Sequence, residues 1–175
     1  MTNSEAARIV RTVLCRGLTF EQTEQILKAM VPVTVEAGAV VFHENEKGQG
    51  LVVALEGTVE IVKRRAEGGE LTIATVTAPT VLGEMSLLTD GAHSATVRAA
   101  SACEFRLLTR AQFERLLQSE SLAAYKVVAT LAEVIARRLA RMDEKVLELT
   151  RRPERGQRVE ELDSFKQKLF SEWML

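Results

Sequence analysis

The most informative stretch of the chain is VLGEMSLLTDGAHSATVRA, residues 81–99. Within it Gly83 leads into a short segment with helical spacing, and the backbone N–H groups that begin such a turn suit a phosphate. The carboxylate of Glu84, next in the chain, suits a sugar hydroxyl. A Gly-Glu pair at the end of a strand is also typical of an ordinary turn, where the acid caps the helix. The surrounding pattern has to decide between the two interpretations.

Alternating apolar and polar residues flank this stretch between residues 33 and 109, and a period of two is that of β-strands. Three runs show it: Val59 and Ile61 with Thr58 and Glu60; Leu71 and Ile73 with Thr72 and Ala74; and Cys103, Phe105 and Leu107 with Glu104, Arg106 and Leu108. Glycines between the runs predict turns: Gly48, Gly50, Gly57, Gly68, Gly69 and Gly91. This spacing predicts an eight-stranded antiparallel roll.

Two short helices are predicted before the strands. The first places its apolar residues three or four positions apart over residues 6–14, and Gly17 predicts its end. The second begins at Thr19, whose side chain can form a capping box with that of Gln22. Pro32 is expected to bound this second helix on its C-terminal side.

The longest helical pattern follows the strands. Thr109 and Gln112 predict a capping box that begins a short helix. An apolar stripe follows, formed by Val128, Leu131, Ile135, Leu139, Met142, Val146 and Leu149. A helix of roughly 26 residues extends about 39 Å, which is more than one small roll can cover. We therefore expect a homodimer through a helix at 122–150; the alternative is a helix that folds back along its own domain.

The sequence thus predicts one α+β domain, an eight-stranded antiparallel β-roll of the jelly-roll (double-stranded β-helix) type. Its parts are N-terminal helices at 1–32, the roll at 33–109, a short helix and a long dimerisation helix at 110–150, and an amphipathic tail helix at 151–175. The apolar side of the tail either packs within the domain or dimer, or docks on a protein partner. Because few residues follow Thr150, we expect no winged helix-turn-helix.

Composition and charge limit the kinds of molecule that the chain is expected to bind and the compartment in which we expect it. The chain has 23 basic and 24 acidic residues and a net charge of −1, which predicts neither DNA nor an anionic membrane as a partner. No apolar run approaches the roughly 20 residues of a membrane-spanning helix. The first five residues, MTNSE, lack the basic and apolar regions of a secretion signal. We expect a cytoplasmic protein.

Few residues suit catalysis or metal binding. Cys15 falls in a predicted helix and Cys103 in a predicted strand, so no disulfide is expected. His43 and His93 have no metal-binding spacing around them, and we expect no metal. Neither histidine has a carboxylate partner in sequence, and no nucleophile with a base is recognisable. The sequence therefore predicts a binding protein without a cofactor, not an enzyme.

The stretch at 83–97 resembles the phosphate-binding cassette of the cyclic AMP receptor protein family. The pattern of that cassette runs Gly-Glu, small or apolar residues, a short loop and Arg-Ser-Ala-x-Val. The order around it is similar too, with a turn at 45–50, a strand at 51–55 and the sequence ARRL at 136–139 of the long helix. The resemblance covers roughly residues 20–150, and it implies a β-roll that binds cyclic AMP or cyclic GMP.

Carried over by position, the resemblance implies a ligand site formed by Gly83, Glu84, Met85, Ser86, His93, Ser94, Ala95, Met142 and Asp143. It implies that Gly83 approaches the ribose and that Glu84 accepts a hydrogen bond from the 2′-hydroxyl. Ser94 and the backbone of Ala95 would bind the phosphate. Met142 and Asp143 match positions that meet the base, often from the partner subunit. For Asp143 the alternative is an acid on a solvated helix face.

His93 stands where the family has the arginine that binds the phosphate. Arginine is permanently cationic and forms a two-pronged bond, whereas histidine offers one N–H and has an ordinary pKa near 6.5. Three interpretations are open: His93 binds phosphate as a cation, the pocket takes another ligand, or the pocket has no ligand and His93 is a loop residue. Arg98 lies close enough in sequence to be proposed as the substitute cation; the alternative is that strand alternation points it elsewhere.

Two functional hypotheses follow. In the first, the chain is a regulatory sensor in which a cyclic nucleotide shifts the helices of a dimer, which then acts on a separate partner. In the second, it is a degenerate domain that binds no nucleotide and serves as a protein interaction module. His93 is the main support for the second hypothesis.

Overall fold

The computed structural model describes residues 1–89, 91–119 and 122–150, without the side chains of residues 134, 138, 141, 142 and 145–150. Its strands are β1 (Val31–Val35), β2 (Val40–Phe42), β3 (Gly50–Glu56), β4 (Thr58–Arg64), β5 (Glu70–Thr77), β6 (Thr80–Leu82), β7 (Thr96–Ala99) and β8 (Cys103–Thr109). Its helices are α1 (Asn3–Val13), α2 (Phe20–Ala29), α3 (Glu84–Thr89), α4 (Arg110–Gln118) and α5 (Leu122–Thr150). The tail helix predicted at 151–175 lies outside the described residues.

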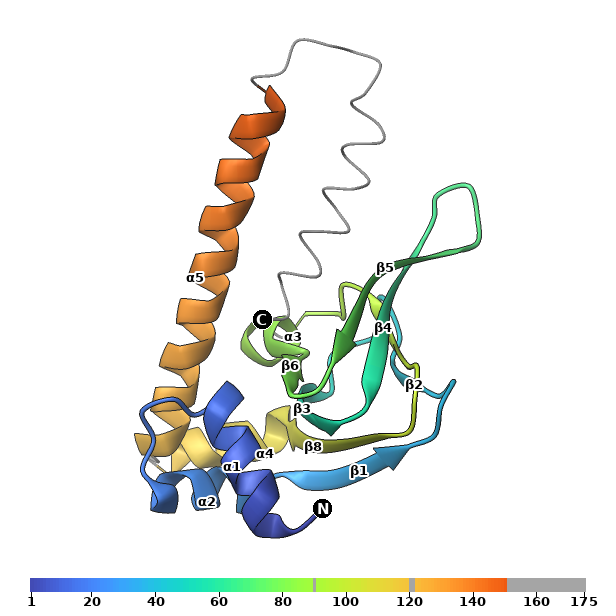
Figure 1. Ribbon diagram of the computed structural model, residues 1–175. Coiled ribbons are helices and arrows are strands. Elements are labelled where there is room, and N and C mark those ends of the chain that lie inside the picture. The colour runs from blue at the N-terminus through green and yellow to red at the C-terminus, as the bar shows by residue number, and fades with distance from the viewer. Residues whose placement is uncertain (90, 120–121, 151–175) are drawn as a thin grey trace.

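The strands form two four-stranded sheets, in the orders β1-β8-β3-β6 and β2-β7-β4-β5. The strand pairings of the described residues are antiparallel, and β1 near the start of the roll pairs with β8 at its end. The prediction of an eight-stranded antiparallel roll with helices at both ends is confirmed (Figure 1).

Strand β3 is buried on both faces and separates two parts of the core. Val52 and Ala54 face the inside of the roll, where they belong to one cluster with Phe105 of β8. Leu51 and Val53 belong to a second cluster, formed with apolar residues of α1, α2, α4 and α5. The helices are therefore attached to the outer side of the β1-β8-β3-β6 sheet.

Capping boxes begin the helices where the sequence predicted them. The Thr19 hydroxyl accepts from the backbone N–H of Gln22 at 3.2 Å, and the Thr109 hydroxyl accepts from that of Gln112 at 3.2 Å. The side-chain oxygen of each glutamine accepts a hydrogen bond from the backbone N–H of the threonine that caps the helix. A further box, between Thr2 and Glu5, begins α1.

One detail of the prediction is wrong. Cys15 is not helical: α1 ends at Val13, and Gly17 with φ +88° lies in a turn closed by a bond from Leu18 N–H to the Cys15 carbonyl. Pro32 follows the end of α2 at Ala29, as predicted, and it is also the second residue of β1, which begins at Val31. The sheet tolerates it because β1 is an edge strand, where a residue without N–H breaks no ladder.

Helix α5 is covered by its own domain only at its start. Leu131 is buried, whereas Leu139, two turns further on, is 57% exposed. Figure 1 shows α1, α2 and α4 gathered at the first turns of α5, while the rest of the helix extends away from them. Within the described residues, the apolar stripe that the sequence predicted is therefore only partly covered.

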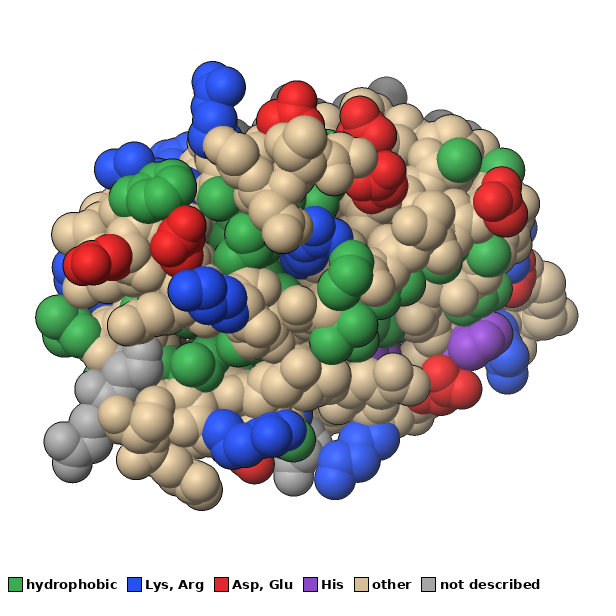
Figure 2. All heavy atoms as spheres, turned by 90° about the horizontal axis from the view of Figure 1, so that it is seen from below, with side chains coloured by type: hydrophobic (Ala, Val, Ile, Leu, Met, Phe, Trp, Pro, Cys, Tyr) green, Lys and Arg blue, Asp and Glu red, His purple; other side chains and the backbone are tan. Residues whose placement is uncertain are grey.

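The surface carries mixed charge. On the face seen in Figure 2, lysines and arginines are interspersed with acidic side chains, as the net charge of −1 would suggest. None of the helices that the structure describes is long and apolar enough to cross a membrane.

Candidate functional site

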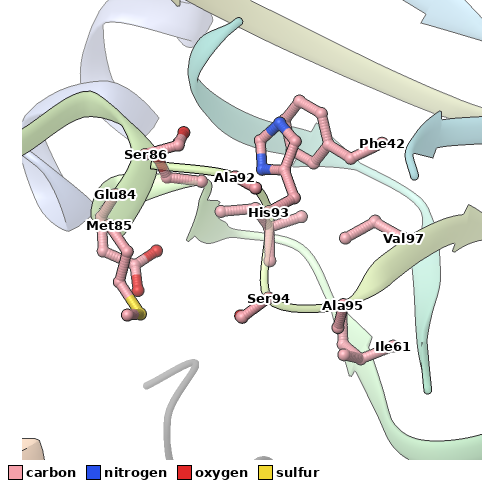
Figure 3. A pocket seen from close by; sticks show the side chains of 12 residues that line it. Phe42, Ile61, Glu84, Met85, Ser86, Ala92, His93, Ser94, Ala95 and Val97 are labelled. Atoms are coloured by element: carbon pink, nitrogen blue, oxygen red, sulfur yellow. The ribbon is translucent and has the colours of Figure 1, made fainter. Parts of the chain in front are cut away.

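A hollow opens between α3, the loop before β7 and the inside of the roll (Figure 3). Its lining residues are Phe42, Ile61, Leu82, Gly83, Glu84, Met85, Ser86, Ala92, His93, Ser94, Ala95 and Val97. It holds about 580 Å³ of space not filled by atoms, including part of its open mouth. The seven residues predicted for the site between Gly83 and Ala95 all lie around this one pocket.

Gly83 joins β6 to α3 and needs to be glycine. Its φ is +79°, a conformation that residues with a side chain rarely adopt. A Cβ at this position would lie 2.6 Å from the carbonyl oxygen of Gly50 on β3. The chain therefore passes close to β3 before it turns into α3, and this turn places Glu84 at the pocket.

Glu84 is the first residue of α3 and is only 8% exposed. A buried carboxylate of this kind needs polar partners, because transfer of a charge out of water is costly. The adjacent Met85 is 37% exposed and offers apolar surface at the same edge. A sugar hydroxyl in the pocket would find both an acceptor and an apolar surface here.

Ser86 lines the pocket, but its hydroxyl serves the backbone. The Oγ lies 2.8 Å from the carbonyl oxygen of Gly83 and 3.3 Å from that of Gly50, and it donates to these acceptors. The Ser86 carbonyl in turn accepts a hydrogen bond of 2.6 Å from Nη2 of Arg110 on α4. Its side chain packs so closely on Gly48 that a Cβ on that glycine would lie 1.9 Å from the Ser86 Cβ. Ser86 fastens α3 to its neighbours, and its role as a ligand contact stays a prediction.

His93 is 7% exposed, and its ring stacks on that of Phe42 with centroids 4.1 Å apart. In Figure 3 the imidazole points toward Phe42 and away from Ser94. Burial lowers the pKa of His93, and the carboxylate of Glu46 opposes this only in part. Its Nε2 has no hydrogen-bond partner within the described part of the chain. The ring is therefore neutral near pH 7, unlike the arginine of the family pattern.

Arg98 does not supply the missing cation. Its Nη2 lies 2.7 Å from Oε2 of Glu70, on the neighbouring part of the β2-β7-β4-β5 sheet. Arg98 is also not among the residues that line the pocket. The proposal that it replaces the family arginine is therefore wrong, because strand alternation directs it to an ion pair on the sheet.

Sequence reasoning missed Lys63. Its ammonium donates to the carbonyl oxygen of Ser94 at 2.5 Å, across 31 residues of sequence. Phe42 and Ile61, which form apolar walls of the pocket, were also not predicted. No local motif marks these residues, because strand pairing alone brings them to the cassette.

The structure does not bring the long helix to the pocket. Asp143 is exposed on α5, and among the described residues that line the pocket none belongs to α5. The side chain of Met142 lies outside the described part. A contact of either residue with a base stays a prediction, and it would need a partner subunit or a movement of α5.

The fold and the pocket define a class of structure, an antiparallel β-roll with a pocket between a Gly-Glu turn and the loop before β7. Residues 32–120 match the family model described as "Cyclic nucleotide-binding domain". The chain belongs to the cyclic nucleotide-binding domain family, as the resemblance predicted.

Three relatives illustrate the similarity. The "Cyclic AMP receptor protein" of Thermus thermophilus is 30% identical over 130 residues, which are 74% of this chain and 58% of that protein. The crystal structure of the Thermus thermophilus catabolite activator protein superposes with a TM-score of 0.70 at 28% identity, covering 78% of this chain and 62% of that one. The regulatory domain of Toxoplasma gondii PKA, crystallised with cAMP, superposes with a TM-score of 0.61 at 25% identity. The match covers 68% of this chain and 46% of that one. The chain thus spans about half to three fifths of the length of these proteins.

Proposed function

We propose that the chain is a regulatory sensor that binds cyclic AMP or cyclic GMP in the pocket at Gly83–Ala95. The observation that carries the proposal is the convergence of Glu84, Ser94 and Ala95 around one pocket in a domain of this family. Glu84 would accept a hydrogen bond from the ribose 2′-hydroxyl, and Ser94 with the backbone of Ala95 would bind the phosphate. The similar proteins whose names and titles mention cAMP support this ligand class.

In this proposal the protein is a cytoplasmic homodimer that acts on a separate partner and catalyses no reaction itself. The exposed Leu139 on α5 supports the dimer, because a second copy would cover it. The net charge of −1 and the mixed charges in Figure 2 support a protein partner over DNA. The apolar side of the segment at 151–175 is a candidate docking element, on the evidence of its sequence alone.

Titration calorimetry with cyclic AMP and cyclic GMP, at pH 6 and pH 8, tests the ligand. We expect saturable binding to the full chain, weakened about 10- to 100-fold by Glu84→Ala, because a hydrogen bond to a charged group contributes about 1.5–3 kcal/mol. Glu67→Ala, in the exposed turn after β4, is the control. Absence of both heat and a melting shift with millimolar nucleotide at both pH values would remove the proposal.

A second candidate is a domain that binds no nucleotide and serves as an interaction module. The neutral His93 stacked on Phe42 favours it, since no cation faces the phosphate position from residue 93. This candidate predicts that Glu84→Ala is silent, whereas deletion of residues 158–175 abolishes association with the partner. The opposite pair of results supports the sensor.

A further inference from the structure

Lys63 joins the cassette to β4, the strand that pairs with β7. It lies on β4, and its ammonium donates to the carbonyl oxygen of Ser94 at 2.5 Å and to Oε1 of Glu44 at 2.6 Å. The other carboxylate oxygen of Glu44 accepts the backbone N–H of Arg64 at 2.9 Å. Three segments distant in sequence are thereby held together at the Ser94 carbonyl.

The Glu44–Lys63 pair is partly shielded from water, with the Glu44 side chain 15% and the Lys63 side chain 36% exposed. Burial opposes ionisation of Glu44, but hydrogen bonds from Lys63 and Arg64 outweigh it, and the pKa of Glu44 lies below its usual range. The carboxylate therefore stays ionised and forms an ion pair with the ammonium of Lys63.

The position of Lys63 determines where the next N–H points. The Ser94–Ala95 peptide is trans and planar, so its C=O and N–H point in opposite directions. The C=O is held by Lys63, and Lys63 is not among the residues that line the pocket. Ala95 does line the pocket and is 7% exposed, yet its N–H has no hydrogen-bond partner among the residues described. A nearly buried N–H of this kind requires an acceptor.

We infer that Lys63 is a positioning residue for anion binding: by holding the Ser94 carbonyl, it aims the Ala95 N–H into the pocket, where the phosphate of the ligand supplies the acceptor. The inference rests on the proposed function. A cation at the carbonyl end also polarises the peptide, so the N–H becomes a stronger donor. Lys63 thus provides, through the backbone, part of what a direct guanidinium would provide at position 93.

Variants of the pair separate this role from simple stabilisation. Lys63→Met removes the donor, and we expect cyclic AMP to bind about tenfold more weakly. Lys63→Arg, which keeps a cationic donor, should restore affinity to within about threefold. Glu44→Gln removes the ion pair but leaves the ammonium beside Ser94, so it should lower the melting temperature as Lys63→Met does without weakening binding. Lys28→Met, on the exposed side of α2, is the control.

Equal losses of affinity in Lys63→Met and Glu44→Gln, in proportion to their losses of stability, would overturn the inference. So would wild-type affinity in Lys63→Met. If the wild-type protein binds no nucleotide, the proposed function is rejected, but the role of Lys63 can still be tested. A measurement on the protein without ligand then tests whether Lys63 positions the Ala95 N–H. We expect the amide resonance of Ala95 in ¹H–¹⁵N spectra to shift and its hydrogen exchange to change in Lys63→Met. The Thr58 amide, which is bound to the Ser101 hydroxyl, should not change. An unmoved Ala95 resonance overturns the positioning role.

Discussion

The imidazole of His93 lies nearly parallel to the ring of Phe42, with an angle of 22° between their planes and 4.1 Å between their centroids. Phe42 ends β2, and its own side chain is buried, so the stack fills the inner end of the pocket with apolar surface. Held in this way, the His93 ring forms part of the wall of the pocket. In the proposed complex, backbone N–H groups and Ser94 would therefore have to bind the phosphate.

Replacement of His93 by arginine should strengthen binding of cyclic AMP. A guanidinium adds a charge-assisted, two-pronged bond worth about 1.5–3 kcal/mol, so we expect a dissociation constant about 10- to 100-fold lower by calorimetry. His93→Gln, which adds no charge, is the matched control. Equal affinities of the two variants would show that residue 93 does not reach the phosphate.

The free energy of unfolding should decrease as the pH is lowered through the range in which His93 takes up a proton. Burial lowers the pKa of His93 in the folded protein, so below about pH 6.5 the unfolded chain binds the proton more readily. The stability conferred by the neutral ring is complete above that pH and is lost as the pH falls toward the folded pKa. Urea unfolding at pH 7.5 and pH 5.5 should show a smaller loss in His93→Gln than in wild type. A slope unchanged in His93→Gln but abolished in His43→Gln would assign the effect to the exposed histidine instead.

Gly83→Ala should cost more stability than Gly68→Ala. Both glycines have positive φ, +79° and +93°, so an alanine at either incurs about 1 kcal/mol of backbone strain. Only at Gly83 would the new Cβ meet another atom, the Gly50 carbonyl oxygen, because Gly68 has open space around it. We expect a loss of about 3 kcal/mol for Gly83→Ala in urea unfolding, and equal losses would contradict the close approach to β3.

Leu139→Asp should weaken the dimer without unfolding the domain. Leu139 is 57% exposed in the single chain, and burial of such a side chain at an interface contributes about 1.5–3 kcal/mol. Sedimentation equilibrium should give a dimer dissociation constant at least about tenfold higher. Arg137→Ser, on the opposite side of α5, should leave it unchanged. A wild-type protein that sediments as a monomer would exclude the dimer.

Cys15 should be inert in the folded protein. Burial raises the pKa of its thiol to about 12, so the reactive thiolate is scarce at pH 8. Ellman's reagent should label Cys15 at least about 100-fold more slowly in the native protein than in urea. A Cys103→Ala background isolates the signal, and rapid labelling of native protein would show that the turn after α1 opens.

The parts of the structure that could be predicted from sequence are those that depend on residues close together in the chain. The capping boxes at Thr19 and Thr109 depend on residues three positions apart, and both were predicted correctly. The cassette at 83–97 is one continuous segment, so its members were found together. Lys63 was missed because it reaches Ser94 only through the pairing of β4 with β7, which register alone determines.

Errors arose where tertiary structure overrides a local signal. Cys15 follows the helical spacing of residues 6–14, yet α1 ends at Val13 and the chain turns at Gly17. Arg98 is near the cassette in sequence, but the pleat turns it toward Glu70. Asp143 could be assigned to the base only by resemblance, and its distance from the pocket depends on the direction of α5, which no local pattern encodes.

The bond from Arg110 to the Ser86 carbonyl ties the first residue of α4 to α3. Its acceptor is a main-chain oxygen, so the bond itself does not require the hydroxyl of Ser86. A ligand that pulls α3 inward would also pull the N-terminal end of α4, and with it the segment that leads into α5. The coupling between the pocket and the long helix would then depend on a main-chain atom of the cassette and not on the chemistry of the side chain at position 86.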